Sequence, residues 1–340
     1  MTDYKDSGVD IQAGDIVKLK IADIVASTYT DSVLTRGGEF AGVVRLNNSD
    51  TSIAVSIDGV GTKIKIAILA NTHNTIGEDL VNHCVNDIAV TGSNPICFVD
   101  YISIGKLDDH IVLEIIEGLS RGCLKNNIPL IGGETAQMPG LYKEGEYDLA
   151  GAIIGTLSDS DHLPRPSICE GDIIIGFESN GLHTNGYSLV RKIIFEINNW
   201  NIDTYNNDLG CTWGEELLKI HISYMNVIKQ YRSNPKLKGF SHITGGGIPG
   251  NLSRIIPKNL SAVIWRKNLP IKSVFQIIAD AGQINDTEMY NVFNMGIGLI
   301  AISSREMAND IIDNPKREYE CWIIGEIVNE NKVDKKIVFV

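Results

Sequence analysis

The chain has 340 residues, of which 43% are hydrophobic and 21% are charged, and its formal net charge is −12 at pH 7. This composition indicates a globular protein with room for two domains, each with its own core. The negative charge argues against a nucleic-acid partner or an anionic membrane surface, because both bind proteins that carry a positive patch.

The N-terminus and the cysteines predict a cytoplasmic protein. The first ten residues, MTDYKDSGVD, lack the apolar segment of a signal peptide, and no apolar run approaches the roughly 20 residues of a membrane helix. The six cysteines are scattered without a C-x-x-C pair, which is typical of reduced thiols in a cytosolic core.

The first distinctive stretch is SIDGVGTKIKIA, residues 56–67. An alternating β-branched run that ends at Ile57 predicts a strand. The small and polar residues that follow it are Asp58, Gly59, Gly61, Thr62 and Lys63. These are the residue types of a phosphate-binding loop, although their spacing fits neither the P-loop nor the dinucleotide fingerprint.

Residues Ile76–Ala89 show helical periodicity with two contrasting faces. One face is apolar, and the other carries short polar side chains: Asp79, Asn82, His83, Asn86 and Asp87. A merely solvated face usually carries Lys, Glu, Gln or Arg, because Asn, Asp and His are poor helix formers. We therefore favour a binding face over a solvated one, and we expect Asp58 and Asp87 to form an all-oxygen Mg²⁺ site shared with a nucleotide. Zinc is not expected, since no residue near His83 and Cys84 has the spacing of a tetrahedral ligand set.

Strand and helix patterns alternate along the rest of the chain, which predicts an α/β (α+β) fold in two domains. Residues Ile96–Ile104 are a predicted strand and Ile111–Leu124 a predicted helix, with Asp108 and Asp109 near its N-cap.

A domain junction is predicted at Ser158–Asp172, which is rich in proline and acidic residues. It lies between predicted strands at 149–157 and 172–178. We therefore divide the chain into an N-terminal domain, 1–165, and a C-terminal domain, 166–340.

A second glycine turn is expected at IGGETAQMPG, residues 131–140, after a short apolar run. The glycines would let the backbone approach a ligand, and Gly133, Glu134 and Thr135 are its candidate contacts. A simple hairpin turn is the alternative.

A third glycine turn, SNGLHTNGYS at residues 179–188, lies between a predicted strand and a helix that runs from Tyr187 to Phe195. Loops in this position bind anions and substrates in α/β proteins. We expect His183, Asn185 and Gly186 to contact a substrate, although a lone histidine is often structural.

The fourth turn, SHITGGGIPGN at residues 241–251, has three consecutive glycines before a predicted helix at Leu252–Ile256. Such a run is costly in backbone entropy unless a ligand or another chain needs the space. Thr244, Gly245 and Gly246 are therefore further candidates for substrate binding.

These motifs together resemble the aminoimidazole ribonucleotide synthetase (phosphoribosylformylglycinamidine cyclo-ligase) family, in family order and over nearly all the chain. The matching stretches are YKDSGVDI (4–11), DGVGTK (58–63), DLVNHCVNDI (79–88), GGETAQMPG (132–140), EYDLAG (146–151), GLHTNGYSLVRK (181–192), HITGGG (242–247) and EMYNVFNMGIG (288–298).

The resemblance implies an ATP-dependent ring closure in purine biosynthesis, with ATP and Mg²⁺ as cofactors, two α/β domains, and a homodimer paired through the N-terminal sheets. It implies that Asp58 and Asp87 hold Mg²⁺ and that Lys63 neutralises phosphate charge. Gly59, Gly61, Thr62, Asn86, Gly133, Glu134 and Thr135 are then nucleotide contacts. His183 is expected to bind the acceptor or to move a proton during ring closure.

One stretch departs from the family pattern: RGGEFAG, residues 36–42, has Glu39 and Ala41 where the family usually has glycines. The contacts of this loop with the nucleotide are therefore open. Two other functions also stay open: a small-molecule kinase of the same superfamily, such as thiamine-monophosphate kinase, and an inactive nucleotide-binding protein.

Overall fold

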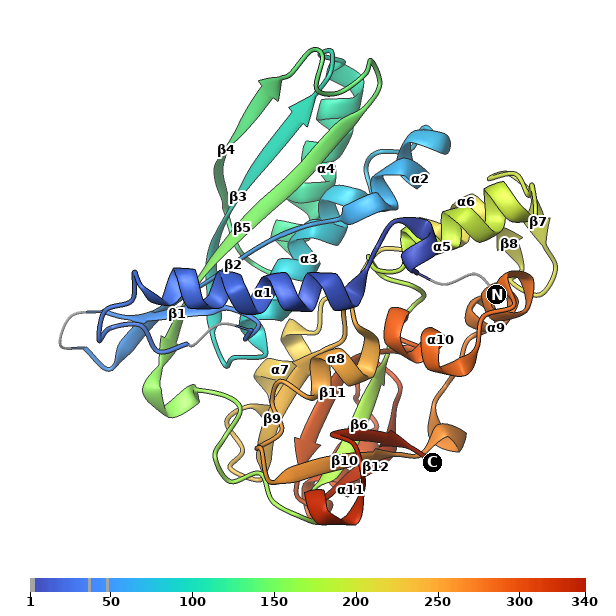
Figure 1. Cartoon of the computed structure of the whole chain (residues 1–340). Helices are drawn as coiled ribbons and strands as arrows, with labels where there is room; N and C mark the ends of the chain where they lie inside the picture. The colour runs from blue at the N-terminus through green and yellow to red at the C-terminus, as the bar shows by residue number, and fades with distance from the viewer. Residues whose placement is uncertain (1–3, 36–37, 47–48) are drawn as a thin grey trace.

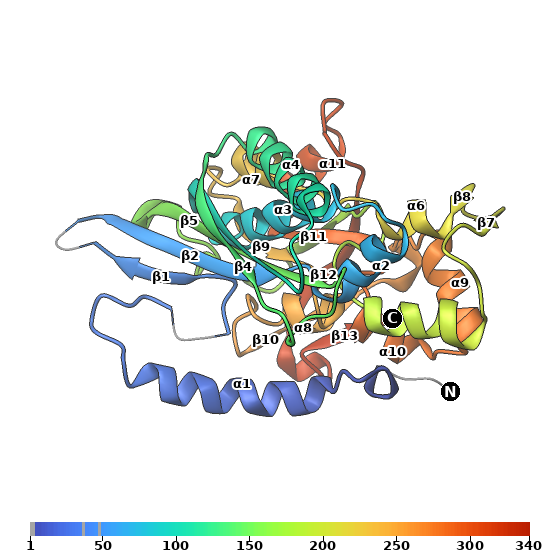
Figure 2. The same ribbon diagram turned by 90° about the horizontal axis from the view of Figure 1, so that it is seen from above.

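The computed structural model describes residues 4–35, 38–46 and 49–340. Two sheets, each with its own helices, form the body of the molecule, and the long helix α1 (Ile11–Ala26) runs along one side of it (Figures 1 and 2). The fold is thus α/β in two halves, as predicted. Among the described residues, no helix combines the length and the apolar character needed to cross a bilayer.

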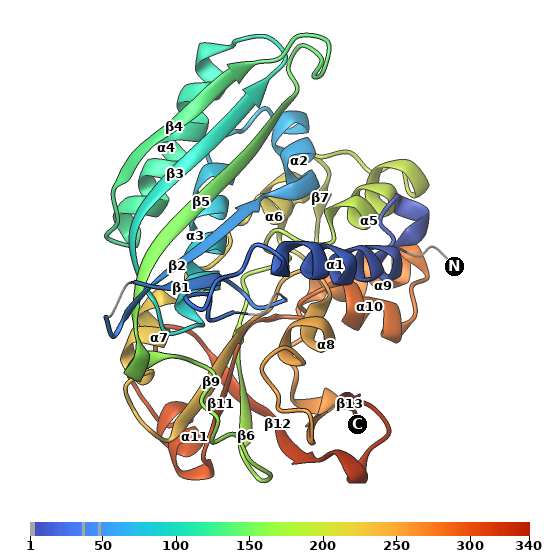
Figure 3. The same ribbon diagram turned by 60° about the vertical axis from the view of Figure 1, so that its left-hand side comes forward.

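The first sheet has the strand order β1-β2-β5-β3-β4. Its strands are β1 (Gly42–Arg45), β2 (Thr51–Gly59), β3 (Asn94–Ile104), β4 (Leu130–Gln137) and β5 (Tyr147–Ser158). Only β3 and β4 are parallel. Helices α3 (Ile76–Ala89) and α4 (Asp109–Lys125) cover one face of this sheet (Figure 3).

The predicted elements of this half are confirmed. Helix α3 has the predicted bounds, and all its residues are buried, so its polar face is not solvated. Helix α4 begins where the Asp108 carboxylate accepts hydrogen bonds from the amides of His110 and Ile111. This cap satisfies two amides that the helix itself cannot bond.

The expected turn at residues 131–140 is wrong for its first part. Residues 130–137 form strand β4, at the edge of the sheet. Its glycines serve close packing instead, because a Cβ on Gly133 would lie 2.4 Å from the Asp100 carboxylate of the neighbouring strand.

The second sheet has the strand order β13-β10-β12-β6-β11-β9. Its strands are β6 (Ile173–Glu178), β9 (Leu237–His242), β10 (Leu260–Ile264), β11 (Ile297–Ser303), β12 (Cys321–Asn329) and β13 (Ile337–Phe339), and β7 (Tyr205–Asn206) with β8 (Cys211–Thr212) forms a small separate ribbon. The first sheet ends at Ser158 and the second begins at Ile173, so the predicted junction connects them. The boundary at residue 165 stays a prediction.

The remaining helices are short and mostly belong to the second half. They are α2 (Ile64–Leu69), α5 (Tyr187–Arg191), α6 (Trp213–Leu217), α7 (Met225–Tyr231), α8 (Gly247–Leu252), α9 (Ser273–Gly282), α10 (Asp286–Val292) and α11 (Arg305–Ile312). Helix α5 continues as a π-helical turn over residues 192–197. The helix predicted at Leu252–Ile256 is misplaced, because α8 starts within the glycine run. A Cβ on Gly247 would lie 2.0 Å from the carbonyl oxygen of Tyr290, so only glycine lets α8 begin there.

Candidate active site

Two carboxylates meet on either side of one histidine at the inner face of the first sheet. Asp58 ends β2, and Asp87 lies in the last full turn of α3, one turn after His83. The Nε2 atom of His83 lies 2.8 Å from Asp58 Oδ2 and 3.8 Å from Asp87 Oδ2. The structure therefore brings together the two predicted metal ligands, with a cationic side chain between them.

The charge on His83 follows from this position. Burial alone would lower its pKa, but the adjacent Asp58 and Asp87 carboxylates outweigh burial and raise the pKa of His83 to about 9. Burial would conversely raise the pKa of Asp58, and the charge and hydrogen bond of His83 lower it instead. At neutral pH the pair is a buried imidazolium beside a carboxylate, and the Asp58 side chain keeps 38% of its surface exposed.

Three more histidines complete a buried cluster at the boundary between the two halves. His242, at the end of β9, places Nδ1 2.8 Å from Asp87 Oδ1. His221 places its Nε2 2.9 Å from His242 Nε2, and its ring stacks on that of His183 at a centroid distance of 4.1 Å. His83, His183, His221 and His242 thus form what we call the histidine cluster.

The turn at residues 179–188 contributes to this cluster, as its predicted role requires. His183 is 1% exposed and has a left-handed backbone (φ +60°), and neither ring nitrogen has a hydrogen-bond partner among the described residues. The neighbouring Thr184 hydroxyl lies 2.9 Å from His83 Nδ1. Thr62 of the DGVGTK turn is hydrogen bonded to Ser188 at 3.0 Å, so the turns of the two halves touch.

The turns at 179–188 and 241–251 are also neighbours of each other. A Cβ on Gly245 would lie 3.2 Å from the amide oxygen of Asn185. Thr244 donates to Asn251 Oδ1 at 3.2 Å within its own turn. The predicted substrate residues His183, Asn185, Gly186, Thr244, Gly245 and Gly246 therefore lie in two adjoining turns of the second half.

Gly245 and Gly246 line a groove of about 1030 Å³ together with the N-terminal segment and α1. Its basic lining residues are Lys5, Lys18, Arg254 and Lys336. Gly38 of the departing loop lines it as well, and Arg254 lies over the ring of Phe40, 4.9 Å from its centroid. Arg36 and Gly37 of that loop lie outside the described residues.

Lys63 and Asn86 contact protein groups rather than an open site, which differs from their expected placement. Lys63 is fully buried, with Nζ 2.8 Å from Asp79 and 2.7 Å from the carbonyl oxygen of Lys219. The amide of Asn86 donates to the Ile222 carbonyl and accepts from the Tyr224 amide. Their predicted nucleotide contacts remain untested, but the contacts present hold residues 219–224, which we call the strap.

Gly133, Glu134 and Thr135 lie away from the carboxylates. Asp58, Gly151, Asp100 and Gly133 form one row across β2, β5, β3 and β4. Three strand spacings of about 4.8 Å separate the ends of this row by roughly 14 Å. Glu134 pairs with Tyr101 and shares the sheet face opposite α3, so within one chain these residues do not join the cluster.

Sequence reasoning missed the roles of Thr184, His221 and His242. His242 was quoted only as part of a motif, and nothing in the local sequence LKIHISY marks His221. The argument against zinc considered local spacing only, whereas the fold brings one ligand atom each from His83, Asp87 and His242 within 4.8 Å of one another. These are contacts between distant segments, and no sequence period encodes them.

Two family models match the chain. "AIR synthase related protein, N-terminal domain" matches residues 38–157, and "AIR synthase related protein, C-terminal domain" matches residues 170–337. The phosphoribosylformylglycinamidine cyclo-ligase of Thermodesulfovibrio yellowstonii is 43% identical over 327 residues, 95% of either chain. That of Thermoanaerobacter pseudethanolicus is 43% identical over 330 residues, 96% of this chain and 97% of the relative.

Solved structures with similar folds are more distant in sequence. Thiamine monophosphate kinase from Aquifex aeolicus has a TM-score of 0.64 at 12% identity, covering 97% of this chain and 98% of that one. "AaThiL complexed with AMPPCP and TMP" has a TM-score of 0.63 at 13% identity, covering 95% and 93%. The hydrogenase maturation protein HypE of E. coli has 0.60 at 16%, covering 84% and 82%. At these identities the likeness shows the fold alone.

Proposed function

The chain belongs to the AIR synthase related family and, within it, to the phosphoribosylformylglycinamidine cyclo-ligases, and on this premise we propose the reaction that its site performs. ATP transfers its γ-phosphoryl group to the formamide oxygen of formylglycinamidine ribonucleotide. A nitrogen of the substrate then attacks the activated carbon, and phosphate leaves. The products are 5-aminoimidazole ribonucleotide, ADP and phosphate.

The observation that carries this proposal is the meeting of two unlike sites at the boundary between the halves. The first half supplies two carboxylates, of which Asp58 is partly exposed. The second half supplies the turn of His183 and the groove beside Gly245. Joining a nucleotide to an acceptor requires two such neighbouring sites in one fixed geometry.

The carboxylates fit a bound Mg²⁺ ion, because hard oxygen ligands suit this ion. Asp58 would hold it from its exposed side, and Asp87 would be the second ligand. The ion would supply neutralisation of the charge that develops on the transferring phosphoryl group. The ATP analogue in a protein of the same fold is consistent with a nucleotide here.

In the second half, the basic side chains along the groove suit a phosphorylated acceptor. His183 lies at the inner end of its turn with two unbonded ring nitrogens, and its backbone is held in a strained left-handed conformation. We assign it to the acceptor, for binding or for a proton transfer during ring closure.

We also propose a homodimer in the cytoplasm. The sheet face opposite α3 exposes Val55, Ile57 and Tyr101 by 40%, 72% and 40%, while Ala54 and Phe98 on the inner face are fully buried. An exposed apolar sheet face of this kind marks a protein interface. Sedimentation should give about twice the 37.2 kDa of the chain.

The test is an assay of the purified chain with formylglycinamidine ribonucleotide, Mg²⁺ and ATP. The proposal predicts one aminoimidazole ribonucleotide for each ADP. A parallel assay with thiamine monophosphate separates the rival kinase, which would form ADP and a phosphorylated acceptor without ring closure. ATP binding with no turnover of either substrate would instead support an inactive nucleotide-binding protein.

A further inference from the structure

We propose that His221 is a positioning residue of this reaction: its imidazole fixes the histidine beside Asp87 and the acceptor turn that carries His183. This inference rests on the proposed function, since it concerns the same site. Its test includes a readout that does not depend on turnover, so the two can fail separately.

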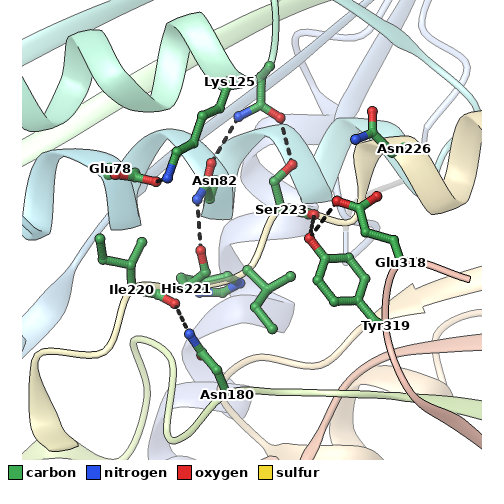
Figure 4. Close-up of a pocket in the computed structure, with 12 residues that line it drawn as sticks. Glu78, Asn82, Lys125, Asn180, Ile220, His221, Ser223, Asn226, Glu318 and Tyr319 are labelled. Carbon is green, nitrogen blue, oxygen red and sulfur yellow. Dashed lines mark hydrogen bonds and ion pairs between the residues drawn. The ribbon is translucent and has the colours of Figure 1, made fainter.

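The strap holds His221 in one place although the strap is neither helix nor strand. Each of its six residues has a backbone atom bonded to a side chain from elsewhere (Figure 4). At His221 itself, the amide donates to Asp79 at 2.7 Å and the carbonyl accepts from Asn82 at 2.8 Å. An irregular segment fixed in this way presents its side chain as firmly as a strand would.

Hydrogen-bond counting then fixes the tautomer of each ring. A carboxylate only accepts, so the Nδ1 atom of His242 donates to Asp87, and the Nε2 atom of the neutral ring carries a lone pair. His221 must therefore donate from Nε2 to His242. Burial lowers the pKa of His221, consistent with a neutral ring.

The other nitrogen of His221 reaches the second half of the site. Nδ1 is left as an acceptor and lies 3.3 Å from the hydroxyl of Thr184. That hydroxyl in turn accepts from His83 Nδ1. One unbroken chain of hydrogen bonds thus runs from Asp87 through His242, His221 and Thr184 to His83 and Asp58.

His221 also holds His183 by stacking. The His183 ring has no polar partner on either nitrogen among the described residues, and buried rings of this kind are usually bonded. The stacked ring of His221, at 4.1 Å, is therefore the aromatic contact that sets its orientation. Losing His221 would release both the carboxylate side and the acceptor side.

Two substitutions separate these contacts. His221→Phe keeps a stacking ring and removes both hydrogen bonds, whereas His221→Gln restores an amide donor toward His242. We expect kcat/KM for ATP to fall about tenfold or more in His221→Phe and to recover to within about threefold of wild type in His221→Gln, as for loss and return of one buried hydrogen bond. His110→Phe, at an exposed position on α4, is the control and should be unchanged.

The readout independent of turnover is the tautomer of His242, observed by ¹⁵N NMR of histidine-labelled full-length protein. We expect an Nδ1–H tautomer in the wild type and in His221→Gln, and its loss in His221→Phe. Wild-type kinetics in His221→Phe, or equal damage in both variants, would overturn the proposal and leave His221 as packing only.

A further variant keeps the proposal testable if His221→Phe does not fold. Thr184→Val removes the hydroxyl that joins His221 to His83 while keeping the side-chain shape. It should lower kcat about tenfold, the loss expected for one buried hydrogen bond, with an unchanged melting temperature. Full activity in Thr184→Val would contradict the chain of bonds. Absence of product from the wild type, with the expected tautomers present, would defeat the proposed function alone.

Discussion

Two stripes of helix α3 carry similar polar residues and do different work. The stripe of Asp79, Asn82 and Asn86 binds the backbone of the strap, so its donors and acceptors are used within the protein. The stripe of His83 and Asp87 faces Asp58 and the histidine cluster, where Asp58 keeps an exposed carboxylate. Composition alone marks the whole face as unusual, and only the partner across the domain boundary distinguishes support from chemistry.

The largest expected effect is on stability, at the supporting stripe. Lys63→Met leaves the Asp79 carboxylate buried without its cation, which should cost about 3–5 kcal/mol in the free energy of unfolding. Urea denaturation measures this loss. Lys65→Met, which removes a partly exposed ion pair with Glu146, is the control and should cost less than about 1 kcal/mol. Unchanged stability with a raised KM for ATP would move Lys63 to the nucleotide and break the comparison.

The next effect is on catalysis, at the other stripe. Asp58→Asn keeps the shape of the side chain and removes one charged ligand, which should cost about 3 kcal/mol of transition-state stabilisation, or about a hundredfold in kcat. Steady-state kinetics with a melting curve measures both activity and folding. Asp109→Asn, at an exposed position on α4, should have wild-type activity. An Asp58→Asn enzyme with the wild-type rate and Mg²⁺ dependence would contradict the assignment.

The charge on His83 predicts a pH dependence of stability. Its pKa is raised from 6.5 to about 9 in the folded state, so the stabilisation is fully present below pH 6.5 and is lost as the pH rises through 9. The loss should be on the order of 2 to 3 kcal/mol. Denaturation between pH 6 and 10 measures it. His83→Gln should lack this slope, and an equal slope in that variant would assign the effect to another group.

The smallest effect again concerns the supporting stripe. Asn82→Ala removes the donor to the His221 carbonyl and the acceptor for Asn126, which should cost about 1–3 kcal/mol in unfolding free energy. Calorimetry measures the shift in melting temperature. Asn309→Ala, exposed on α11, should change stability by less than about 0.5 kcal/mol. If Asn82→Ala instead weakened ATP binding at unchanged stability, both stripes would bind ligand.

Local patterns in the sequence predicted much of the fold. The period of α3, the N-cap at Asp108 and the strand before Asp58 are all set by neighbouring residues, and all three are present. The strand β4 was missed because its glycines serve a close contact with Asp100, which is 33 positions away in the sequence. The partner of Lys63 and the place of His221 were missed for the same reason: a buried ion pair and a strap depend on contacts between the halves.

The most direct measurement is a crystal structure of the full chain with Mg²⁺ and a non-hydrolysable ATP analogue. The account predicts a metal ion about 2.1 Å from a carboxylate oxygen of Asp58. Its phosphates should lie between the DGVGTK turn and the turn of His183, and Lys63 should still be paired with Asp79. A metal ion bound elsewhere, with Asp58 contacting only His83, would contradict it.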